Sequence, residues 1–262
     1  MLQKELFYAA LGTGATCLAT VLGAAMVFFF KKDLSPTVQR VFLGFAAGVM
    51  IAASVWSLLI PAMEMAQAQG GSALLPAGLG FVLGGGFLML LDSLLPHLHP
   101  GSREPEGLHA NWKRTTMIVL AVTLHNIPEG MAVGAAFAGV LSGNVGGAAA
   151  AALAAGIAIQ NIPEGAIISL PLAGCGMKKR RAFAVGGGSG AVEPVGAAVM
   201  LALTGLLQPL LPWCLAFAAG AMLLVSVREL IPSACCADRQ NAGTLSVLLG
   251  FVVMMLLDVA LG

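Results

Sequence analysis

A polar hexapeptide occurs twice within apolar stretches of this sequence. Residues 125–130 read HNIPEG and residues 160–165 read QNIPEG, and we call these segments the first and the second motif. On a helix, the first, second and fifth residues of each motif share one face, so imidazole, amide and carboxylate groups would point together from two helices. This mixed donor set suits Zn²⁺ and its first-row neighbours, whereas Ca²⁺ or Mg²⁺ would take oxygen alone. The candidate metal ligands are His125, Asn126, Glu129, Gln160, Asn161 and Glu164.

The two motif carboxylates stand in stretches that hold no lysine or arginine. A carboxylate near the centre of a bilayer costs about 2.5 to 3.5 kcal/mol, so it needs a positive partner, either a bound metal ion or a proton. Each motif also contains a proline, which leaves an earlier main-chain carbonyl without its helical donor and is expected to kink the helix. At membrane depth such a carbonyl needs protein, water or an ion, which strengthens the case for an ion path.

The composition indicates the class of protein. Of the 262 residues, 58% are apolar and 10% are charged, which excludes an ordinary soluble globule and indicates a polytopic membrane protein. The first apolar run is too long for the apolar region of a secretory signal, so it is predicted to be a membrane helix. The predicted fold is all-α, a single transmembrane domain over residues 1–262 with eight helices at about residues 5–30, 40–63, 74–96, 115–140, 147–173, 182–206, 209–231 and 242–261.

The basic residues are distributed unevenly over the loops. With the N-terminus outside, every lysine and arginine except Lys4 falls on the cytoplasmic side, which places both termini outside the cytoplasm. The expected location is therefore an integral membrane one, the inner membrane of a bacterium, although the sequence leaves an organellar membrane open. The five cysteines form no CxxC pair and are predicted to be packing residues rather than disulfides.

The helices also repeat one another. The segment Phe45–Pro61 resembles Phe217–Pro232, and the glycine and aspartate of Gly84–Asp92 recur with the same spacing in Gly250–Asp258. A weaker echo links Gly12–Ala15 to Gly188–Ala191. Helices one to three would thus match helices six to eight in opposite orientation, around two central helices that match each other. Secondary transporters use such an inverted three, two, three arrangement to place a substrate site near the midplane, although it could also be a relic of gene duplication.

Further carboxylates lie outside the motifs. Glu193, beside a proline in the sixth helix, either joins the same cavity as the motifs or is a lone protonated glutamate. Asp92, Glu229 and Asp258 lie near helix ends, where solvated pairing is as good an interpretation as a role in an ion path. Arg228, next to Glu229, is interpreted as an interfacial charge.

The paired motifs on the fourth and fifth of eight helices, with a Glu-Pro in the sixth, resemble the ZIP (Zrt/Irt-like) divalent metal transporters. The short loops and the glutamine of the second motif are most similar to the GufA-type branch. The resemblance implies uptake of zinc, and often of cadmium, iron or manganese, into the cytoplasm by a homodimer that works like an elevator. It also implies a binuclear centre, with one metal bound by His125, Glu129, Gln160 and Glu164 and the second by Asn126, Glu129, Asn161, Glu164 and Glu193.

The sequence departs from relatives at two positions. Asn161 stands where some relatives have aspartate, which should weaken the second metal subsite. Arg228 stands where relatives can have a histidine in a cytoplasmic exit site, which puts that site in doubt. The remaining residues of the exit site would match Asp92, His97, His99 and Glu229, and Met50 and Ser57 match pathway positions on the second helix, although Met50 also suits plain packing.

Other classes of function stay open at this point. An intramembrane zinc metalloenzyme could use a similar donor set, although the sequence holds no HExxH, and we expect no enzyme. A proton-coupled carrier of an organic solute or a metal exporter could also bury carboxylates. No catalytic cofactor and no nucleic-acid partner are expected. The expected partners are divalent metal ions as substrate, of which one could stay bound at the second subsite, the lipid bilayer and a second copy of the chain.

Overall fold

The structure, a computed structural model, describes residues 2–30, 34–96, 108, 114–206, 208–235 and 241–261. Eight helical segments of this part are long and apolar enough to cross a membrane, which confirms the all-α fold predicted from the sequence. The first four segments consist of α1 (Leu2–Ala25) with η1 (Met26–Phe28), of α2 (Pro36–Ala53) with η2 (Ser54–Leu59) and α3 (Ile60–Ala68), of η3 (Pro76–Gly80) with α4 (Phe81–Leu94), and of α5 (Arg114–Leu141). The second four consist of α6 (Gly147–Gly174), of α7 (Lys179–Gly188) with η4 (Ser189–Ala191) and α8 (Val192–Leu206), of η5 (Gln208–Leu210) with α9 (Leu211–Val225), η6 (Ser226–Leu230) and α10 (Ile231–Cys235), and of α11 (Ala242–Leu261).

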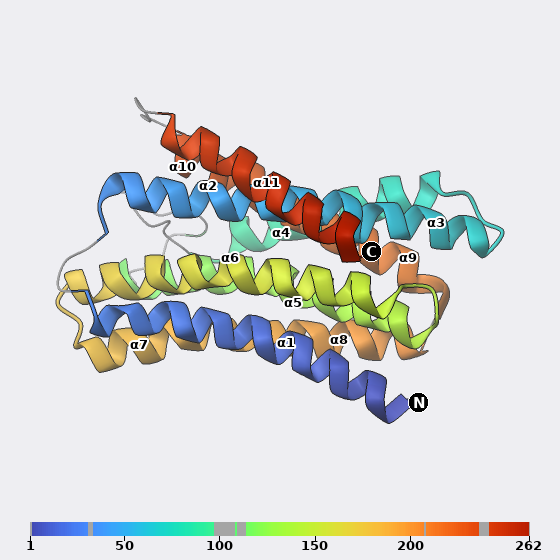
Figure 1. Ribbon diagram of the computed structural model, residues 1–262, viewed down its shortest axis with the longest axis horizontal. Helices are drawn as coiled ribbons and strands as arrows, with labels where there is room; N and C mark the ends of the chain where they lie inside the picture. The colour runs from blue at the N-terminus through green and yellow to red at the C-terminus, as the bar shows by residue number, and fades with distance from the viewer. Residues whose placement is uncertain are drawn as a thin grey trace.

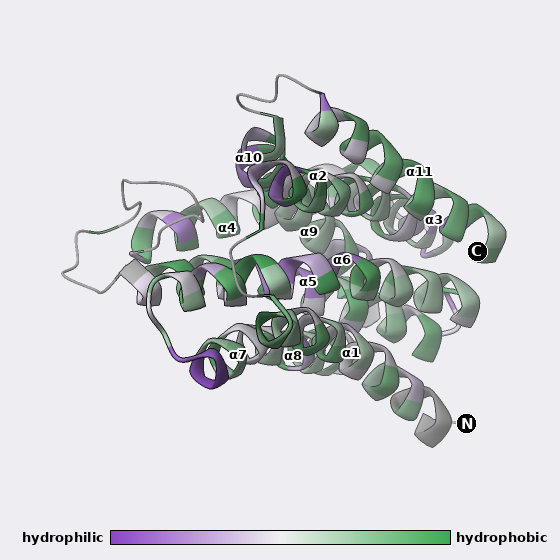
Figure 2. Ribbon diagram, turned by 60° about the vertical axis from the view of Figure 1, so that its left-hand side comes forward, coloured by the Kyte–Doolittle hydropathy of each residue, from purple (hydrophilic) through white to green (hydrophobic). Residues whose placement is uncertain are grey.

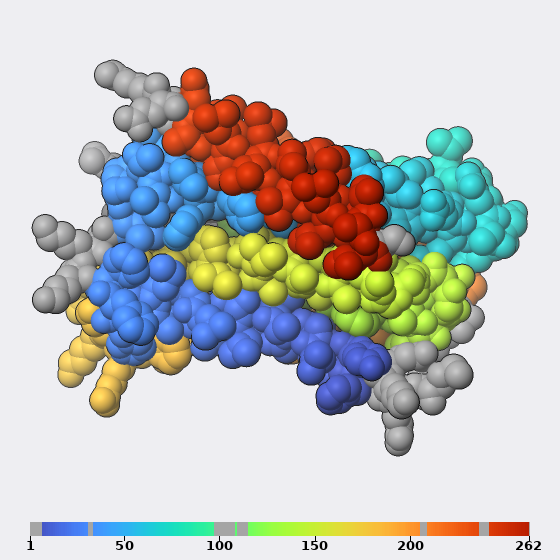
Figure 3. Space-filling view, in the orientation of Figure 1, coloured from blue at the N-terminus to red at the C-terminus, as the bar shows by residue number. Residues whose placement is uncertain are grey.

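The helices form two groups that lie side by side (Figure 1). One group contains α2 and α11, which pack along each other, together with the pair of α4 and α9. The other group contains α1, which packs on α6, and α5, which packs on α8. Both termini lie in the half of the molecule that carries α3, as an even number of spans requires (Figure 1). In the space-filling view α11 lies diagonally across the surface of the first group (Figure 3).

The inverted repeat is visible in the contacts of the first group. A Cβ atom on Gly48 of α2 would overlap the Val247 carbonyl of α11, and one on Gly250 of α11 would overlap the Phe45 carbonyl of α2. The pair of α4 and α9 repeats this reciprocal contact through Gly84 and Gly220. Because the sequence repeat matches Gly48 with Gly220 and Gly84 with Gly250, the two halves bring equivalent helices together through equivalent glycines. Small residues allow this close approach of helices in a membrane.

The second group shows the same symmetry and corrects one detail of the sequence analysis. Each motif ends in a glycine that has no room for a side chain, because Gly165 contacts the Thr20 carbonyl and Gly130 contacts the Glu193 carbonyl. In the inverted repeat, Thr20 of α1 is therefore equivalent to Glu193 of α8. The echo between Gly12–Ala15 and Gly188–Ala191 would have paired Thr20 with Gly196 instead, so that register was wrong. A four-residue pattern of glycine and small polar residues recurs too easily in membrane helices to fix a register.

Both halves also contain a π-helical turn at the equivalent place, η2 in the second span and η6 in the seventh. A proline follows each turn, Pro61 in α3 and Pro232 in α10. Proline has no N–H and its ring clashes with the carbonyl of the preceding turn, and a wider turn relieves this clash. These turns bring Ser57 and Glu229 into the interior, where both are buried. The motif prolines, in contrast, lie inside continuous α-helices.

The end of the molecule at which α7 begins is rich in basic residues, and we call it the basic end. Figure 2 shows the most hydrophilic stretch at the start of α7, which begins with Lys179, Arg180 and Arg181. The Lys179 ammonium donates to the main-chain carbonyl of Phe30, at 2.9 Å, and so ties this end of α7 to the end of the first span. The described cysteines, Cys17, Cys175, Cys214 and Cys235, are free thiols, and Cys175 is exposed rather than packed as the sequence analysis predicted.

Candidate metal centre

The two motifs lie in the middle of α5 and α6, and their polar residues face the interior. Asn126, Gln160 and Asn161 are fully buried, Glu129 is 1% exposed, and His125 and Glu164 are largely buried. Glu193, from the first turn of α8, is also fully buried. The structure therefore brings the predicted ligands of both motifs and of the sixth span into one region, at the contact of α5 with α6 and α8.

A chain of hydrogen bonds connects these residues. The Gln160 amide Nε2 donates to Glu129 Oε1 and, at 2.7 Å, to Asn161 Oδ1. The Asn161 amide Nδ2 donates to the main-chain carbonyl of Thr16 on α1, at 3.3 Å. One NH₂ group thus lies between two of the oxygen atoms that the sequence analysis assigned to a metal, and its partial positive charge offsets part of the charge of the Glu129 carboxylate.

Several buried polar atoms of this region have no hydrogen-bond partner in the described part of the chain. A buried donor or acceptor without a partner costs about 1 to 3 kcal/mol, and native proteins retain such groups mainly where water, an ion or function requires them. Because these atoms are concentrated around the two motifs, we interpret this region as a binding site for a polar or charged ligand. The atoms are both amide atoms of Asn126, Glu129 Oε2, Gln160 Oε1, Glu164 Oε1 and Glu193 Oε2.

His125 pairs with a carboxylate from outside the motifs. Its Nε2 atom contacts Glu229 Oε2, from the π-turn η6. Both side chains border a cavity of about 40 Å³, which also touches Met50, Glu129 and Glu164 and extends to the exposed Ser233 at the basic end of the molecule. We call it the motif cavity. Its volume is enough for a few water molecules or a partly hydrated ion. Met50 and Glu229, two of the residues predicted for the pathway or the exit site, therefore line the motif cavity together with motif residues.

The other predicted pathway residues lie elsewhere. The Ser57 hydroxyl lies within hydrogen-bond distance of both carboxylate oxygens of Asp258, at 2.8 and 3.0 Å. Ser57, Asp258 and Glu64 line a second cavity of about 200 Å³. Asp92 forms an ion pair with Arg228, at 3.3 Å between Oδ2 and Nη1. His97 and His99 lie outside the described residues, so of the predicted exit site the structure describes only Asp92 and Glu229, together with Arg228.

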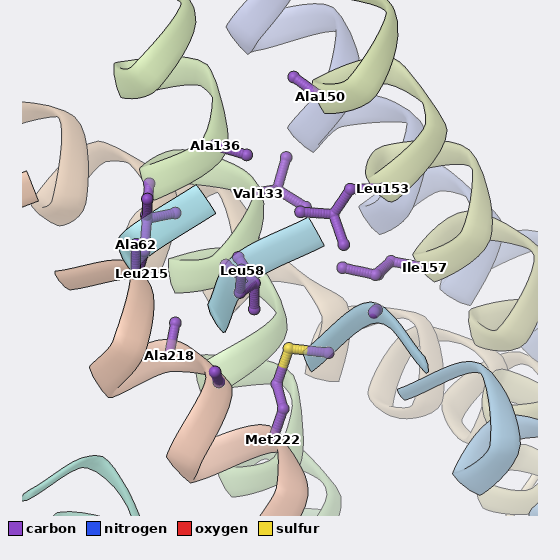
Figure 4. Close-up of a cluster of buried hydrophobic side chains, with 14 of the residues drawn as sticks. Leu58, Ala62, Val133, Ala136, Ala150, Leu153, Ile157, Leu215, Ala218 and Met222 are labelled. Carbon is purple, nitrogen blue, oxygen red and sulfur yellow. The ribbon is translucent and has the colours of Figure 1, made fainter. Parts of the chain in front are cut away.

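An apolar layer separates the two cavities. It consists of Leu58 from η2, Val133 from α5, and Leu153 and Ile157 from α6, which converge in Figure 4. All four side chains are fully buried. Along α5 the layer begins one turn beyond Glu129, about 6 Å along the helix axis. The motif cavity therefore reaches toward the basic end and is closed from the cavity beside Asp258.

The sequence analysis missed two residues of the site, Thr16 and Thr20 of α1. Besides the contact of Thr16 with Asn161, the Thr20 hydroxyl donates to Glu193 Oε1, at 3.0 Å. Neither residue carries charge, and threonines are common in membrane helices, where the hydroxyl bonds its own helix. Only the correct register of the repeat, which matches Thr20 with Glu193, could have pointed to this contact.

The donor set decides what kind of ion the site can bind. In the described part of the chain, no three histidine, cysteine, aspartate or glutamate side chains converge closely enough to hold a metal by themselves. A metal at the motifs would consequently take amide oxygens as ligands beside imidazole and carboxylate. Such a set without thiolate binds less tightly than a structural zinc site, which suits an ion that must leave again.

Fold and site together define a class, the polytopic helical membrane transporters with an inverted repeat and a polar site halfway along the two central spans. Comparison with known proteins gives the family. The family model described as ZIP Zinc transporter matches residues 102–258. The chain is 36% identical to zinc transporter ZIP11 of Homo sapiens over the full length of both chains. It is 38% identical to zinc transporter GufA of Myxococcus xanthus, over 93% of this chain and 95% of that protein.

A third relative, zinc transporter ZIPB of Bordetella bronchiseptica, is 38% identical over 97% of this chain and 82% of its own length. The chain belongs to the ZIP zinc transporter family. This confirms the resemblance drawn from the motifs, and it confirms that the protein is a transporter rather than an enzyme.

Proposed function

We propose that this protein carries Zn²⁺ into the cytoplasm through a site formed by the two motifs and Glu193, with Cd²⁺, Fe²⁺ and Mn²⁺ as further candidate substrates. The observation that carries the proposal is the cluster of buried imidazole, amide and carboxylate groups at mid-membrane, several of whose atoms have no partner among the described residues. No lysine or arginine lies in α5 after its first residue or anywhere in α6, so a metal cation is the natural counter-charge. The names of the relatives support zinc as the substrate.

The proposed site has two subsites that share the motif glutamates. His125, Glu129, Gln160 and Glu164 would hold the transported ion next to the motif cavity. Asn126, Glu129, Asn161, Glu164 and Glu193 would hold a second ion, which could stay bound. Asn161 is neutral and already donates to a carbonyl, so we expect the second subsite to bind its ion more weakly than a site with a third carboxylate.

In the conformation described, the Gln160 amide takes the place of a cation. Its Nε2 atom donates to two proposed ligand oxygens, while its own Oε1 atom has no partner. A bound metal ion would favour the flipped side-chain amide of Gln160, in which Oε1 takes the present place of Nε2. In that orientation three oxygen atoms, those of Gln160, Glu129 and Asn161, face one another, and a positive charge between them is needed to stabilise the arrangement. Gln160 would then stabilise the metal-free site and also coordinate the metal.

The basic end of the molecule is proposed to face the cytoplasm, because basic loops stay on that side of a membrane. The motif cavity points to this end and the apolar layer closes the other, so the conformation would be open inward. Moving the group of α1, α5, α6 and α8 past the group of α2, α4, α9 and α11 would bring the site to the opposite side, as in an elevator. We propose a homodimer in a bacterial inner membrane as the working unit, with both termini outside.

Metal flux into proteoliposomes tests this function. Purified protein is reconstituted with a fluorescent metal indicator inside, and Zn²⁺, Cd²⁺, Mn²⁺ or Fe²⁺ is added outside. We expect saturable flux in wild type and in Ser93→Ala, an exposed serine that bonds its own helix, and a loss of flux in His125→Ala. Absence of flux with every ion, or full flux in His125→Ala, would contradict the proposal. Uptake of labelled zinc by intact cells then separates import from export, because an exporter would lower the zinc content.

A further inference from the structure

The first span carries a row of three buried threonines. Thr13, Thr16 and Thr20 are 6%, 1% and 0% exposed. The hydroxyls of Thr13 and Thr16 donate within their own helix, to the carbonyls of Ala9 and Thr13 at 3.0 and 2.9 Å. Thr20 differs, because its hydroxyl lies 3.0 Å from Glu193 Oε1 on another span. Its distance to the carbonyl of Thr16 in its own helix is longer, 3.4 Å. Thr20 is thus a threonine of this row whose hydroxyl donates to a carboxylate of the candidate metal centre.

The inverted repeat relates the two residues of this contact, Thr20 and Glu193, to each other. The two motif glycines pack on the carbonyls of Thr20 and Glu193, as described above. One turn further along each span the contact recurs with the roles exchanged, since Gly23 packs on the carbonyl of Ile162 and Gly196 on that of Ile127. Thr20 and Glu193 therefore occupy equivalent positions, each backed by one motif, and their side chains meet.

The two equivalent positions carry different chemistry, a hydroxyl and a carboxylate. Two carboxylates at this contact would repel each other in a region of low dielectric constant. The Thr20 hydroxyl instead donates a hydrogen bond to one oxygen of Glu193. The other oxygen, Oε2, has no partner among the described residues and remains available to a ligand.

We propose that Thr20 is a positioning residue of the second metal subsite, which holds the Glu193 carboxylate with Oε2 free for the metal. This inference rests on the proposed function. Thr20 does not bind the ion itself but limits the rotation of a carboxylate that would otherwise have several orientations. A ligand held in its bound orientation loses less entropy when the metal arrives.

The substitution Thr20→Val tests the inference, because valine keeps the branched shape and removes the hydroxyl. Zinc stoichiometry and affinity are measured by equilibrium dialysis and metal analysis of the full-length protein in lipid nanodiscs. We expect the zinc affinity of the second subsite to fall about 10-fold to 100-fold, the range of one hydrogen bond to a charged group. Thr20→Ser, which restores the hydroxyl, should recover it.

Thr13→Val is the matched control, since Thr13 is also buried on the same helix but its hydroxyl bonds only carbonyls of that helix. Its zinc binding should equal that of wild type. The thermal unfolding temperature without metal shows whether each variant is folded. Wild-type zinc binding in a folded Thr20→Val, or equal losses in Thr20→Val and Thr13→Val, would overturn the inference and leave the proposed function intact. If wild-type protein binds no zinc at all, the proposed function itself fails.

Discussion

Glu129 gives the sharpest prediction, because both proposed subsites use it. Its side chain is 1% exposed. One oxygen accepts a hydrogen bond from Gln160, and the other has no partner in the described part of the chain. The substitution Glu129→Gln keeps the shape of this side chain and removes the charge. It should therefore stabilise the metal-free protein and weaken zinc binding.

The size of both effects follows from the environment of the residue. Without metal, the variant avoids the cost of about 2.5 to 3.5 kcal/mol for a carboxylate near the bilayer centre. It loses about 1 kcal/mol where a hydrogen bond to a charged group becomes a neutral one. The net gain in the free energy of unfolding is about 1.5 to 2.5 kcal/mol. Zinc at 100 times its dissociation constant stabilises wild type by about 2.7 kcal/mol, and a 100-fold weaker site would yield only about 0.4 kcal/mol.

The assay is thermal unfolding of the protein in nanodiscs, with and without zinc. We expect a higher unfolding temperature for Glu129→Gln than for wild type in the absence of metal, and almost no increase when zinc is added. Glu64→Gln is the control, because Glu64 is an exposed carboxylate beside the other cavity, and it should keep the zinc-dependent increase. The reasoning is refuted if Glu129→Gln is less stable than wild type without metal and retains the full zinc effect.

Two further predictions concern the second subsite. Asn161→Asp places a carboxylate against the Thr16 carbonyl, so we expect a loss of about 1 to 3 kcal/mol in the metal-free free energy of unfolding and a larger zinc-dependent rise in unfolding temperature; a zinc effect equal to that of wild type would show that this residue is no ligand. Gly130→Ala forces α5 away from the Glu193 carbonyl, which should cost about 1 to 3 kcal/mol and weaken zinc binding in dialysis. Gly188→Ala, where a Cβ meets nothing within 4 Å, should change neither quantity, and equal behaviour of the two glycine variants would contradict this explanation.

The sequence was sufficient to predict the number of spans, because a membrane helix must be a long apolar run. The repeat of the second and third spans in the seventh and eighth was also predictable, since it depends on glycines that the packing requires, such as Gly48 and Gly220. The motif residues were recognisable because a carboxylate inside an apolar run has no simple structural explanation.

Other parts of the site depend on contacts between distant segments. The contact of His125 with Glu229 joins the fourth span to the seventh, and a π-turn before Pro232 aims the glutamate inward. A helical wheel of the seventh span assumes α-helical periodicity and so misplaces residues after such a turn. The contact of Thr20 with Glu193 was hidden for a similar reason, because α1 and α8 carry no recognisable motif of their own and their register depends on close contacts with the motif glycines of α6 and α5.

The most direct test of the central claim is to locate zinc in the protein itself. Anomalous diffraction at the zinc absorption edge, from crystals of zinc-loaded protein, gives the metal positions independently of any transport assay. The account predicts anomalous density between α5 and α6, next to His125 and the two motif glutamates, with nitrogen and oxygen ligands only. Density confined to the cavity beside Asp258, or to a cysteine, with none at the motifs, would contradict it.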